Sequence, residues 1–335
     1  MQRIGALDAM RTMMSVLREV SLEDLRQQAD TTPRLLVVGP TQDEARRLGL
    51  ALTGPEGQFA SIYRGADESV EGVERIDMAV VWDPARSGAG SRIAEALRFE
   101  SPPVPIIRFE GRGPEQVDAV EKLRAEMLKR SPERAPAFGR ALPAFRAAAA
   151  RQVIDETAAA NAQFSLVSNI PALIPVIGNI AAAGADFIVL TKNQVMMLYK
   201  LAAIYGRDMR DQRRILQEVL PVVGAGLVWR TVAREAAALM PFAAGTVPKI
   251  VIAYVGTVAV GRAAEFYYRT GLRPSRAQME QYYRQALAKL RQLDFPGVRR
   301  FAGRDDQGPP EWRAPQVTVV REDDPRREID RSARG

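Results

Sequence analysis

Residues 35–52 read LLVVGPTQDEARRLGLAL, and this stretch predicts the fold of the first part of the chain. Its opening run, 35–39, is short and apolar, as is typical of a strand buried on both faces. A turn at Pro40 follows, and residues 43–52 then repeat apolar positions at helical spacing. A buried strand followed directly by a helix is the basic unit of a parallel α/β sheet.

The same alternation of strand and helix continues to residue 130. We expect further strands at 59–63, 78–83 and 104–109, and helices at 91–99 and 115–129. Strands that alternate with helices imply right-handed crossovers and a mostly parallel sheet covered on both faces. The predicted fold class is therefore an α/β N-terminal domain with a parallel sheet, followed by a mostly α-helical domain.

Composition shifts divide the chain further. Pro132, Pro136 and Pro143 mark a linker or a broken helical connection, and the sequence beyond it is long, helical and apolar. The expected parts are an amphipathic N-terminal helix at 1–30, renewed at Ser21, then the α/β domain at 31–130, the linker at 131–150, an apolar helical module at 151–295 and a flexible tail at 296–335.

Composition also excludes several kinds of chemistry. The 335 residues include no cysteine and no histidine, which removes thiolate catalysis, Cys or His metal sites and the usual proton shuttle near neutral pH. No disulfide can form, and the first residues lack the continuous apolar core of a signal peptide. We therefore expect a protein of the cytoplasmic side that is not an enzyme and holds no metal.

The net charge and its distribution along the chain indicate which classes of partner to expect. A formal net charge of +7 suits phosphate-bearing partners or an anionic membrane surface. Lysine and arginine are spread along the chain rather than gathered in a block with aromatic residues. We therefore expect no nucleic-acid partner.

The loop after the first strand stands where a phosphate site would be expected, because the α/β half resembles the G domain of Era-type GTPases. A P-loop needs glycines, a lysine and a hydroxyl at fixed spacing. Here Gly39 is the only match, since Glu44, Ala45 and Arg46 replace the second glycine, the lysine and the hydroxyl. The resemblance thus implies a degenerate pseudo-GTPase domain that binds no cofactor; a flavodoxin-like or response-receiver-like domain is the alternative.

Two later positions agree with this interpretation. Phe109-Glu110-Gly111-Arg112 stands in place of the guanine-reading Asn-Lys-x-Asp motif and has neither its amide nor its final carboxylate. Asp83 ends a predicted strand, but Asp83-Pro84-Ala85-Arg86 lacks the glycine of Asp-x-x-Gly. We therefore expect Asp83 to cap the turn into Pro84 rather than to bind a metal.

The apolar module carries two segments that are long enough to cross a bilayer as helices, 164–190 and 236–261, and a shorter one at 216–229. Asp186 and Lys249 lie within the two long segments, and a lipid-facing charge there would be costly. Prolines interrupt both segments as well. A kinked helical hairpin that meets a membrane and a buried soluble bundle are the two interpretations.

The order of short motifs in this module resembles the bacterial domain-of-unknown-function family six-nine-seven, which occurs in YcjF-type inner-membrane proteins and commonly follows Era-type GTPase domains. The motifs are Ile170-Pro171, Ile174-Pro175, Gly184-Ala185-Asp186-Phe187, Lys192-Asn193-Gln194, Leu201 to Gly206, Gly256 to Gly261 and Phe266-Tyr267-Tyr268. The resemblance covers about residues 150–292 and implies a helical architecture at a membrane, with no established activity.

Six polar residues of the module are candidates for structural or interaction roles: Asp186, Lys192, Asn193, Gln194, Tyr205 and Lys249. A buried ion pair between Asp186 and Lys249 is the specific hypothesis, and a capping or solvent-facing Asp186 is the alternative.

The degenerate α/β domain and the apolar helical module together predict a non-catalytic scaffold on the cytoplasmic side of the bacterial inner membrane, with a protein partner or a second copy. The alternative is a soluble, cytoplasmic helical adaptor that oligomerises or binds an active GTPase.

Overall fold

The computed structural model describes residues 22–70, 73, 75–98, 102–167, 179–219 and 246–293, without the side chains of 167, 179–188, 246–249 and 291. All of the described residues belong to one compact unit, which lies within residues 1–294. The first 21 residues of the helix predicted at 1–30, with Ser21, and the predicted tail at 296–335 therefore lie outside the described residues, whereas Glu23–Asp30 of the predicted range is helical.

A parallel sheet of four strands forms the centre of the α/β part. The strands are β1 (Leu35–Gly39), β2 (Ser61–Gly65), β3 (Met78–Val81) and β4 (Ile106–Arg108). Their order is β2-β1-β3-β4, and Val37 of β1 pairs with Tyr63 on one side and Val80 on the other. This is the strand order of flavodoxin-like sheets. The α/β fold class is confirmed, whereas the closer likeness to a G domain stays a prediction.

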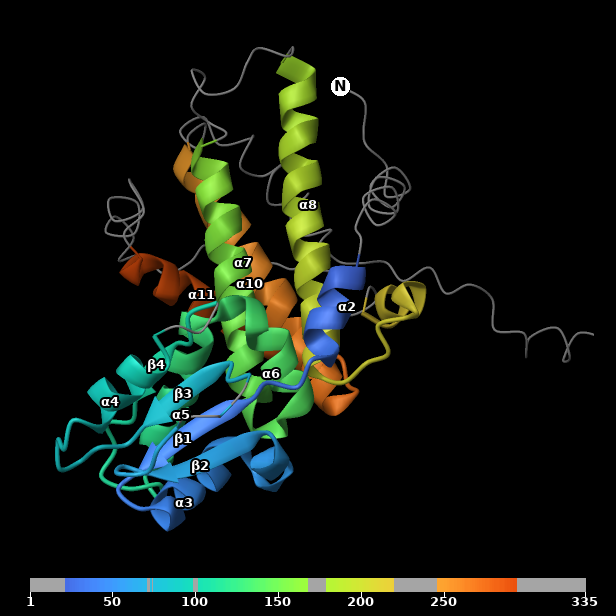
Figure 1. Cartoon of the computed structure of the whole chain (residues 1–335). Helices are drawn as coiled ribbons and strands as arrows, with labels where there is room; N and C mark the ends of the chain where they lie inside the picture. The colour runs from blue at the N-terminus through green and yellow to red at the C-terminus, as the bar shows by residue number, and fades with distance from the viewer. Residues whose placement is uncertain are drawn as a thin grey trace, which may run out of the picture. The chain divides into compact units, whose positions relative to one another are not determined.

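Helices cover both faces of this sheet (Figure 1). Leu36, Val38, Ala79 and Val81 point to the face that packs against α4 (Ala89–Ala96). On the opposite face, the ring of Tyr63 fills the space left by Gly49 of α3 (Gln42–Thr53). Helix α5 (Val117–Arg130) contacts both α3 and β4.

Three strands differ from the expected ranges, and β3 ends at Val81 rather than at residue 83. The strand expected at 59–63 is β2 at 61–65, because Pro55–Phe59 forms a 3-10 turn that leaves Phe59 91 % exposed. The strand expected at 104–109 is shorter, since only Ile106–Arg108 pairs with β3.

Residues 131–150 form a packed, broken helical connection rather than a solvated linker. They comprise 3-10 turns at Pro132–Arg134 and Pro143–Phe145, helix α6 (Ala135–Ala141) and the start of α7. Phe138 and Phe145 are fully buried, with ring centroids 5.0 Å apart. Of the two alternatives expected for this segment, the structure therefore shows the broken helical connection.

The remaining described residues form a helical bundle (Figure 1). Its members are α7 (Arg146–Val167), α8 (Asn179–Ile204), α10 (Thr246–Thr270) and α11 (Arg276–Gln292), with the short α2 (Glu23–Asp30) against α6 and α8. Ser275 caps α11 through a capping box. Gly206 follows the last turn of α8 with a positive φ of 73°.

Candidate functional site

The β1–α3 connection is too short to wrap a phosphate. Strand β1 ends at Gly39 and α3 begins at Gln42, so only Pro40 and Thr41 separate them. A P-loop uses the four residues between its two glycine positions to wrap the phosphates, whereas here Gln42 and Asp43, two of those four, already belong to α3. Thr41 instead caps α3, because its Oγ1 accepts a hydrogen bond from the Glu44 backbone N–H at 3.2 Å. That N–H group is therefore already bonded within the chain.

The residues that replace the P-loop side chains are part of α3. Glu44, Ala45 and Arg46 lie in its first two turns, where Ala45 is buried and Arg46 is exposed. A Cβ atom on Gly39 would lie 2.6 Å from the Ala45 backbone nitrogen. Gly39 is thus required by the close approach of helix and strand, and the degenerate loop acts as a tight turn.

Asp83 caps the loop between β3 and α4. Its carboxylate accepts hydrogen bonds from the backbone N–H groups of Ser87 at 2.8 Å, Gly88 at 3.0 Å and Ala89 at 3.1 Å. The bond from Ser87 contributes most to holding the pKa of the Asp83 carboxyl below its ordinary value. The capping role expected for Asp83 is confirmed.

The segment after β4 is also folded onto itself. Phe109 is 5 % exposed and packs edge-on against Trp82, with ring centroids 5.9 Å apart. The Arg112 backbone N–H donates to Gln116 Oε1 at 2.6 Å. Residues 109–112 thus form a turn whose aromatic side chain belongs to the core.

An open groove of about 980 Å³ lies between β4 and α5. Because β4 is an edge strand, one side of its backbone carries no strand partner among the described residues. Val117, at the start of α5, lines this groove and is 69 % exposed. Charged side chains of both signs, such as Lys122 and Glu126, complete its lining.

A hydrogen-bonded cluster of four polar side chains crosses the interior of the bundle. This polar layer consists of Asn161 on α7, Asn193 and Gln194 on α8, and Thr257 on α10. Asn161 Nδ2 donates to Thr257 Oγ1 at 2.9 Å, and Gln194 Nε2 donates to the same oxygen at 3.1 Å. Asn193 Nδ2 donates to Asn161 Oδ1 at 2.8 Å. Asn161, Thr257 and Gln194 are at most 2 % exposed.

Thr257 fixes the orientation of this layer. Its hydroxyl has one proton, which it donates to the Ala253 carbonyl at 2.7 Å, and its two lone pairs accept from Asn161 and Gln194. Gln194 must therefore present its Nε2 to Thr257. Its Oε1 then points elsewhere in the interior and has no hydrogen-bond partner among the described residues.

Two pairs of contacts set the alignment of α8 with α10. Gln194 meets Thr257, and the ring of Tyr205 stacks on that of Tyr268 with centroids 6.2 Å apart. Both pairs are 63 residues apart, so the two helices run parallel in one register. The same offset brings the backbone of Asp186 level with that of Lys249. Their side chains lie outside the described ones, so the ion pair stays a prediction.

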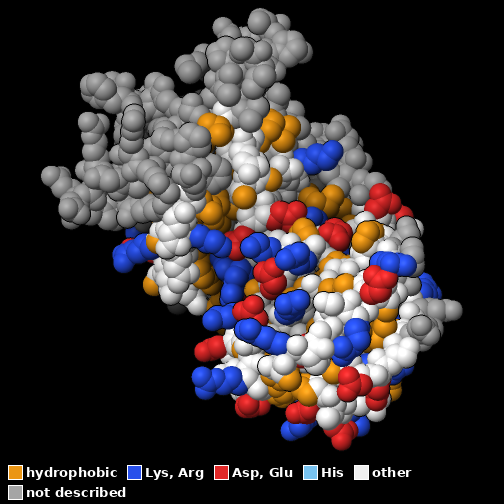
Figure 2. Space-filling model, turned by 60° about the vertical axis from the view of Figure 1, so that its left-hand side comes forward, with side chains coloured by type: hydrophobic (Ala, Val, Ile, Leu, Met, Phe, Trp, Pro, Cys, Tyr) orange, Lys and Arg blue, Asp and Glu red, His pale blue; other side chains and the backbone are white. Residues whose placement is uncertain are grey.

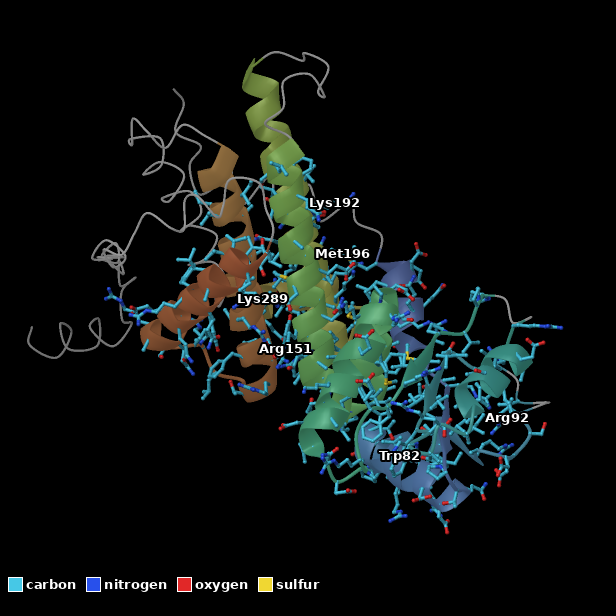
Figure 3. All side chains as sticks on the ribbon, turned by 90° about the vertical axis from the view of Figure 1, so that its left-hand side faces the viewer. Trp82, Arg92, Arg151, Lys192, Met196 and Lys289 are labelled. Carbon is cyan, nitrogen blue, oxygen red and sulfur yellow. The ribbon has the colours of Figure 1, made fainter. Side chains whose placement is uncertain are left out.

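Lys192 and Tyr205, the other two candidate residues of the module, are not part of the polar layer. Lys192 is exposed on α8, and Figure 3 shows it farther from the α/β part than Met196 and Arg151. Tyr205 is partly buried, and this burial raises its pKa to about 12. The guanidinium of Arg207 lies 5.6 Å above the ring of Tyr268, the stacking partner of Tyr205. Tyr205 therefore belongs to the packing of the bundle.

Sequence reasoning missed Asn161 and Thr257, although they form the centre of the polar layer. The sequence offered one signal for each: Asn161 is a single amide in an Ala-rich helical segment, and Thr257 is a single hydroxyl in a run of small residues. It also missed Arg124 on α5, which is buried and donates to the carbonyls of Leu52 at 2.8 Å and Ala51 at 2.7 Å. Arg124 thereby satisfies the end of α3.

One described helix stretch, Ile250–Thr270 of α10, is long and apolar enough to cross a membrane, and 61 % of its most apolar part is buried within the bundle. No group of acidic side chains suited to a metal ion occurs in the part of the chain that the structure describes. No family model matches the chain, and neither the curated proteins nor the solved structures include a match.

Proposed function

We propose that the protein is a membrane-associated scaffold whose helical bundle contacts the cytoplasmic face of the bacterial inner membrane. The supporting observation is the direction of the bundle. Ile154 of α7 packs at Gly261 and Asn161 bonds to Thr257, so α7 runs antiparallel to α10 and α8. The end of α7 at Val167 and the starts of α8 and α10 therefore lie at one end of the bundle, named here the apolar end, and this end holds the described parts of the two long apolar segments, 164–190 and 236–261.

The opposite end of the bundle packs on α6, which follows the α/β part directly in the chain, and α7 contacts α5 of that part. Gly139 of α6 lies against Ile204 of α8, and Arg140 donates to the Arg207 carbonyl at 3.0 Å. Figure 2 shows the same polarity: charged side chains crowd the α/β part, and few lie on the helices close to the grey atoms. A surface that changes from charged to apolar along one axis fits an interface between water and lipid.

The α/β part is proposed to present a protein-binding surface. The unpaired edge of β4, the groove beside it and the exposed Val117 are features that extended peptides use when they add a strand to a sheet. The closed β1–α3 turn supports a scaffold rather than a nucleotide switch.

A soluble adaptor that oligomerises through the apolar end is the second candidate. It is favoured by the burial of α10, whose central residues Ala253, Thr257 and Gly261 face other helices of the same chain. A core helix of a soluble bundle has this pattern.

Flotation with vesicles distinguishes the membrane-associated scaffold from the soluble adaptor. Val251, Ile252 and Val255 are half-buried on α10 at the apolar end. We expect the protein to float with vesicles that contain anionic lipid, and Ile252→Glu to abolish flotation because an acid there opposes insertion. Gln281→Glu, at an exposed position of α11, is the matched control and should float like the parent. The adaptor would be established instead by two results together: the parent protein stays in the aqueous fraction, and it forms an oligomer that Ile252→Glu dissociates.

A further inference from the structure

One face of α5 carries charges that alternate in sign along the helix. Asp118, Lys122, Glu126 and Arg130 follow one another at four-residue spacing, so their side chains lie in one row. All four line the groove beside β4. Asp118, Lys122 and Arg130 are exposed, and Glu126 is half-buried while it accepts a hydrogen bond from Arg130 at 3.2 Å. The row is therefore open to a partner along its whole length.

This row of charges is complementary to itself. When a second copy of α5 lies antiparallel to the first, centred midway between Lys122 and Glu126, Lys122 faces the partner's Glu126. Asp118 then faces the partner's Arg130. Each contact occurs twice about a two-fold axis, and every one joins opposite charges. A parallel copy in the same register would bring like charges together, which costs free energy. The row therefore favours a second copy of this chain in one orientation.

The free edge of β4 allows the same two-fold arrangement. The Phe109 N–H donates to the Val81 carbonyl at 2.9 Å, so the odd-numbered positions of this strand bond to β3. The backbone N–H and C=O groups of Ile106 and Arg108 therefore point to the opposite, free edge. Against an antiparallel copy of β4, Ile106 would face the partner's Arg108, and each such pair exchanges two hydrogen bonds.

The strand pattern and the helix pattern meet in one groove. Ile107, the midpoint of the strand pattern, lines it together with Lys122 and Glu126, which flank the midpoint of the helix pattern. A single two-fold axis can therefore pass through both midpoints. All of the lining residues lie between 106 and 130, so the described helices of the bundle leave the groove open to a second molecule. The exposed Val117 adds apolar surface at its rim.

From these two patterns we infer that the α/β part binds a second copy of this chain through the β4–α5 groove, about a two-fold axis that sets the two α5 helices antiparallel. The inference rests on the proposed function, because it names the partner of the protein-binding surface. The alternating charges set the orientation of the two copies. The strand pairing uses backbone groups that an isolated sheet edge leaves without partners.

Charge exchange tests the inference on the full-length protein without lipid, by sedimentation velocity. We expect the parent to form a dimer. Lys122→Glu and Glu126→Lys should each raise the dimer dissociation constant about tenfold or more, because each sets like charges opposite one another twice. An equimolar mixture of the two variants should regain the dimer, since both contacts then join opposite charges. Lys129→Glu, exposed on α5 and outside the groove lining, is the matched control and should dimerise like the parent.

Thermal unfolding that matches the parent establishes that each variant is folded. If one is not, Asp118→Lys and Arg130→Asp provide an equivalent exchanged pair. A parent that sediments as a monomer overturns the inference. A dimer that persists in both single variants, or that the mixture fails to restore, also overturns it. A dimer that Ile252→Glu dissociates while the charge variants leave it intact places the contact at the apolar end instead.

The flotation assay separates this inference from the membrane proposal. A monomer that floats with vesicles overturns the inference and leaves the membrane proposal standing. A dimer that responds to charge exchange as expected but does not float supports the inference and removes the membrane contact alone.

Discussion

Asn161 on α7 and Thr257 on α10 share a hydrogen bond of 2.9 Å in an interior where both side chains are completely buried. The bond joins two helices that approach closely over small residues, and it brings a third helix into register through Gln194. Polar contacts of this kind favour one alignment of the helices over others, since a shifted register would leave the donors unpaired.

Replacing Thr257 with valine tests the polar layer. The change keeps the shape of the side chain but leaves Asn161 Nδ2 and Gln194 Nε2 without their acceptor. We expect the free energy of unfolding to fall by about 2–4 kcal/mol in urea titrations. Thr157→Val is the control, because among the described residues that hydroxyl bonds to no group but the Val153 carbonyl of its own helix. Equal losses for the two variants would show that the layer contributes nothing beyond local bonds.

Arg124→Lys should destabilise the α/β part by about 2 kcal/mol. A lysine cannot donate to the Leu52 and Ala51 carbonyls in the fixed geometry of the guanidinium. Arg130→Lys, on the exposed side of the same helix, should change the free energy of unfolding by less than about 0.5 kcal/mol. Thermal unfolding of both variants provides the measurement, and unchanged stability of Arg124→Lys would contradict the capping role.

Asp83 makes stability depend on pH. Its folded-state pKa is lowered, so the ionised carboxylate stabilises the fold above its unfolded pKa of about 4, and this contribution is lost as the pH falls through the lower, folded value. Asp83→Asn should therefore be less stable than the parent at pH 7, with a gap that narrows in acid. Asp67→Asn, at a 97 % exposed side chain, should show little difference at either pH. A gap for Asp83→Asn that is constant with pH would contradict the assignment.

Gly261→Ala should weaken the contact between α7 and α10. The added Cβ would lie 2.6 Å from Ile154 Cγ1, so the helices must separate or the isoleucine must shift. We expect a loss of about 1–3 kcal/mol in urea unfolding. Gly90→Ala in α4 is the control, since its nearest neighbour would be 3.6 Å away and alanine favours the helix.

Calorimetry with magnesium present should detect no binding of GTP or ATP at micromolar affinity. The reason is the two-residue connection between Gly39 and Gln42, in which Thr41 already bonds to the start of α3. A clear micromolar isotherm would overturn both the pseudo-GTPase interpretation and the scaffold proposal, because a switch would then be the better explanation.

The elements of the α/β part could be predicted from the sequence because their signals are local. The run at Leu35–Gly39 and the spacing in Gln42–Thr53 are each sufficient to indicate a strand and a helix. The boundary of β2 was misplaced because Phe59 is apolar and yet exposed, and its 3-10 turn depends on Pro55 and Gly57. Residues 131–150 looked like a linker because prolines dominate the local signal, whereas burial of Phe138 and Phe145 is a tertiary property.

Only part of the candidate site could be predicted from the sequence. Asn193 and Gln194 could be singled out as polar residues in an apolar helix, but their partners could not. Asn161 lies 32 residues before Asn193, and Thr257 lies 63 residues after Gln194, so only the folded bundle brings the four together. Asp83 was predictable, because a strand-terminal aspartate bonds within its own loop.

The two residues between β1 and α3 also determine how this turn responds to redesign. Restoring glycine, lysine and serine at positions 44–46 would place all three on a helix that has already begun at Gln42, with Gly39 still packed against the backbone of residue 45. Substitution alone therefore forms no phosphate-binding loop, because Gln42 and Asp43 would also have to leave the helix for the backbone between the two glycines to wrap a phosphate. The early start of α3, and not the number of residues, separates this turn from a nucleotide site.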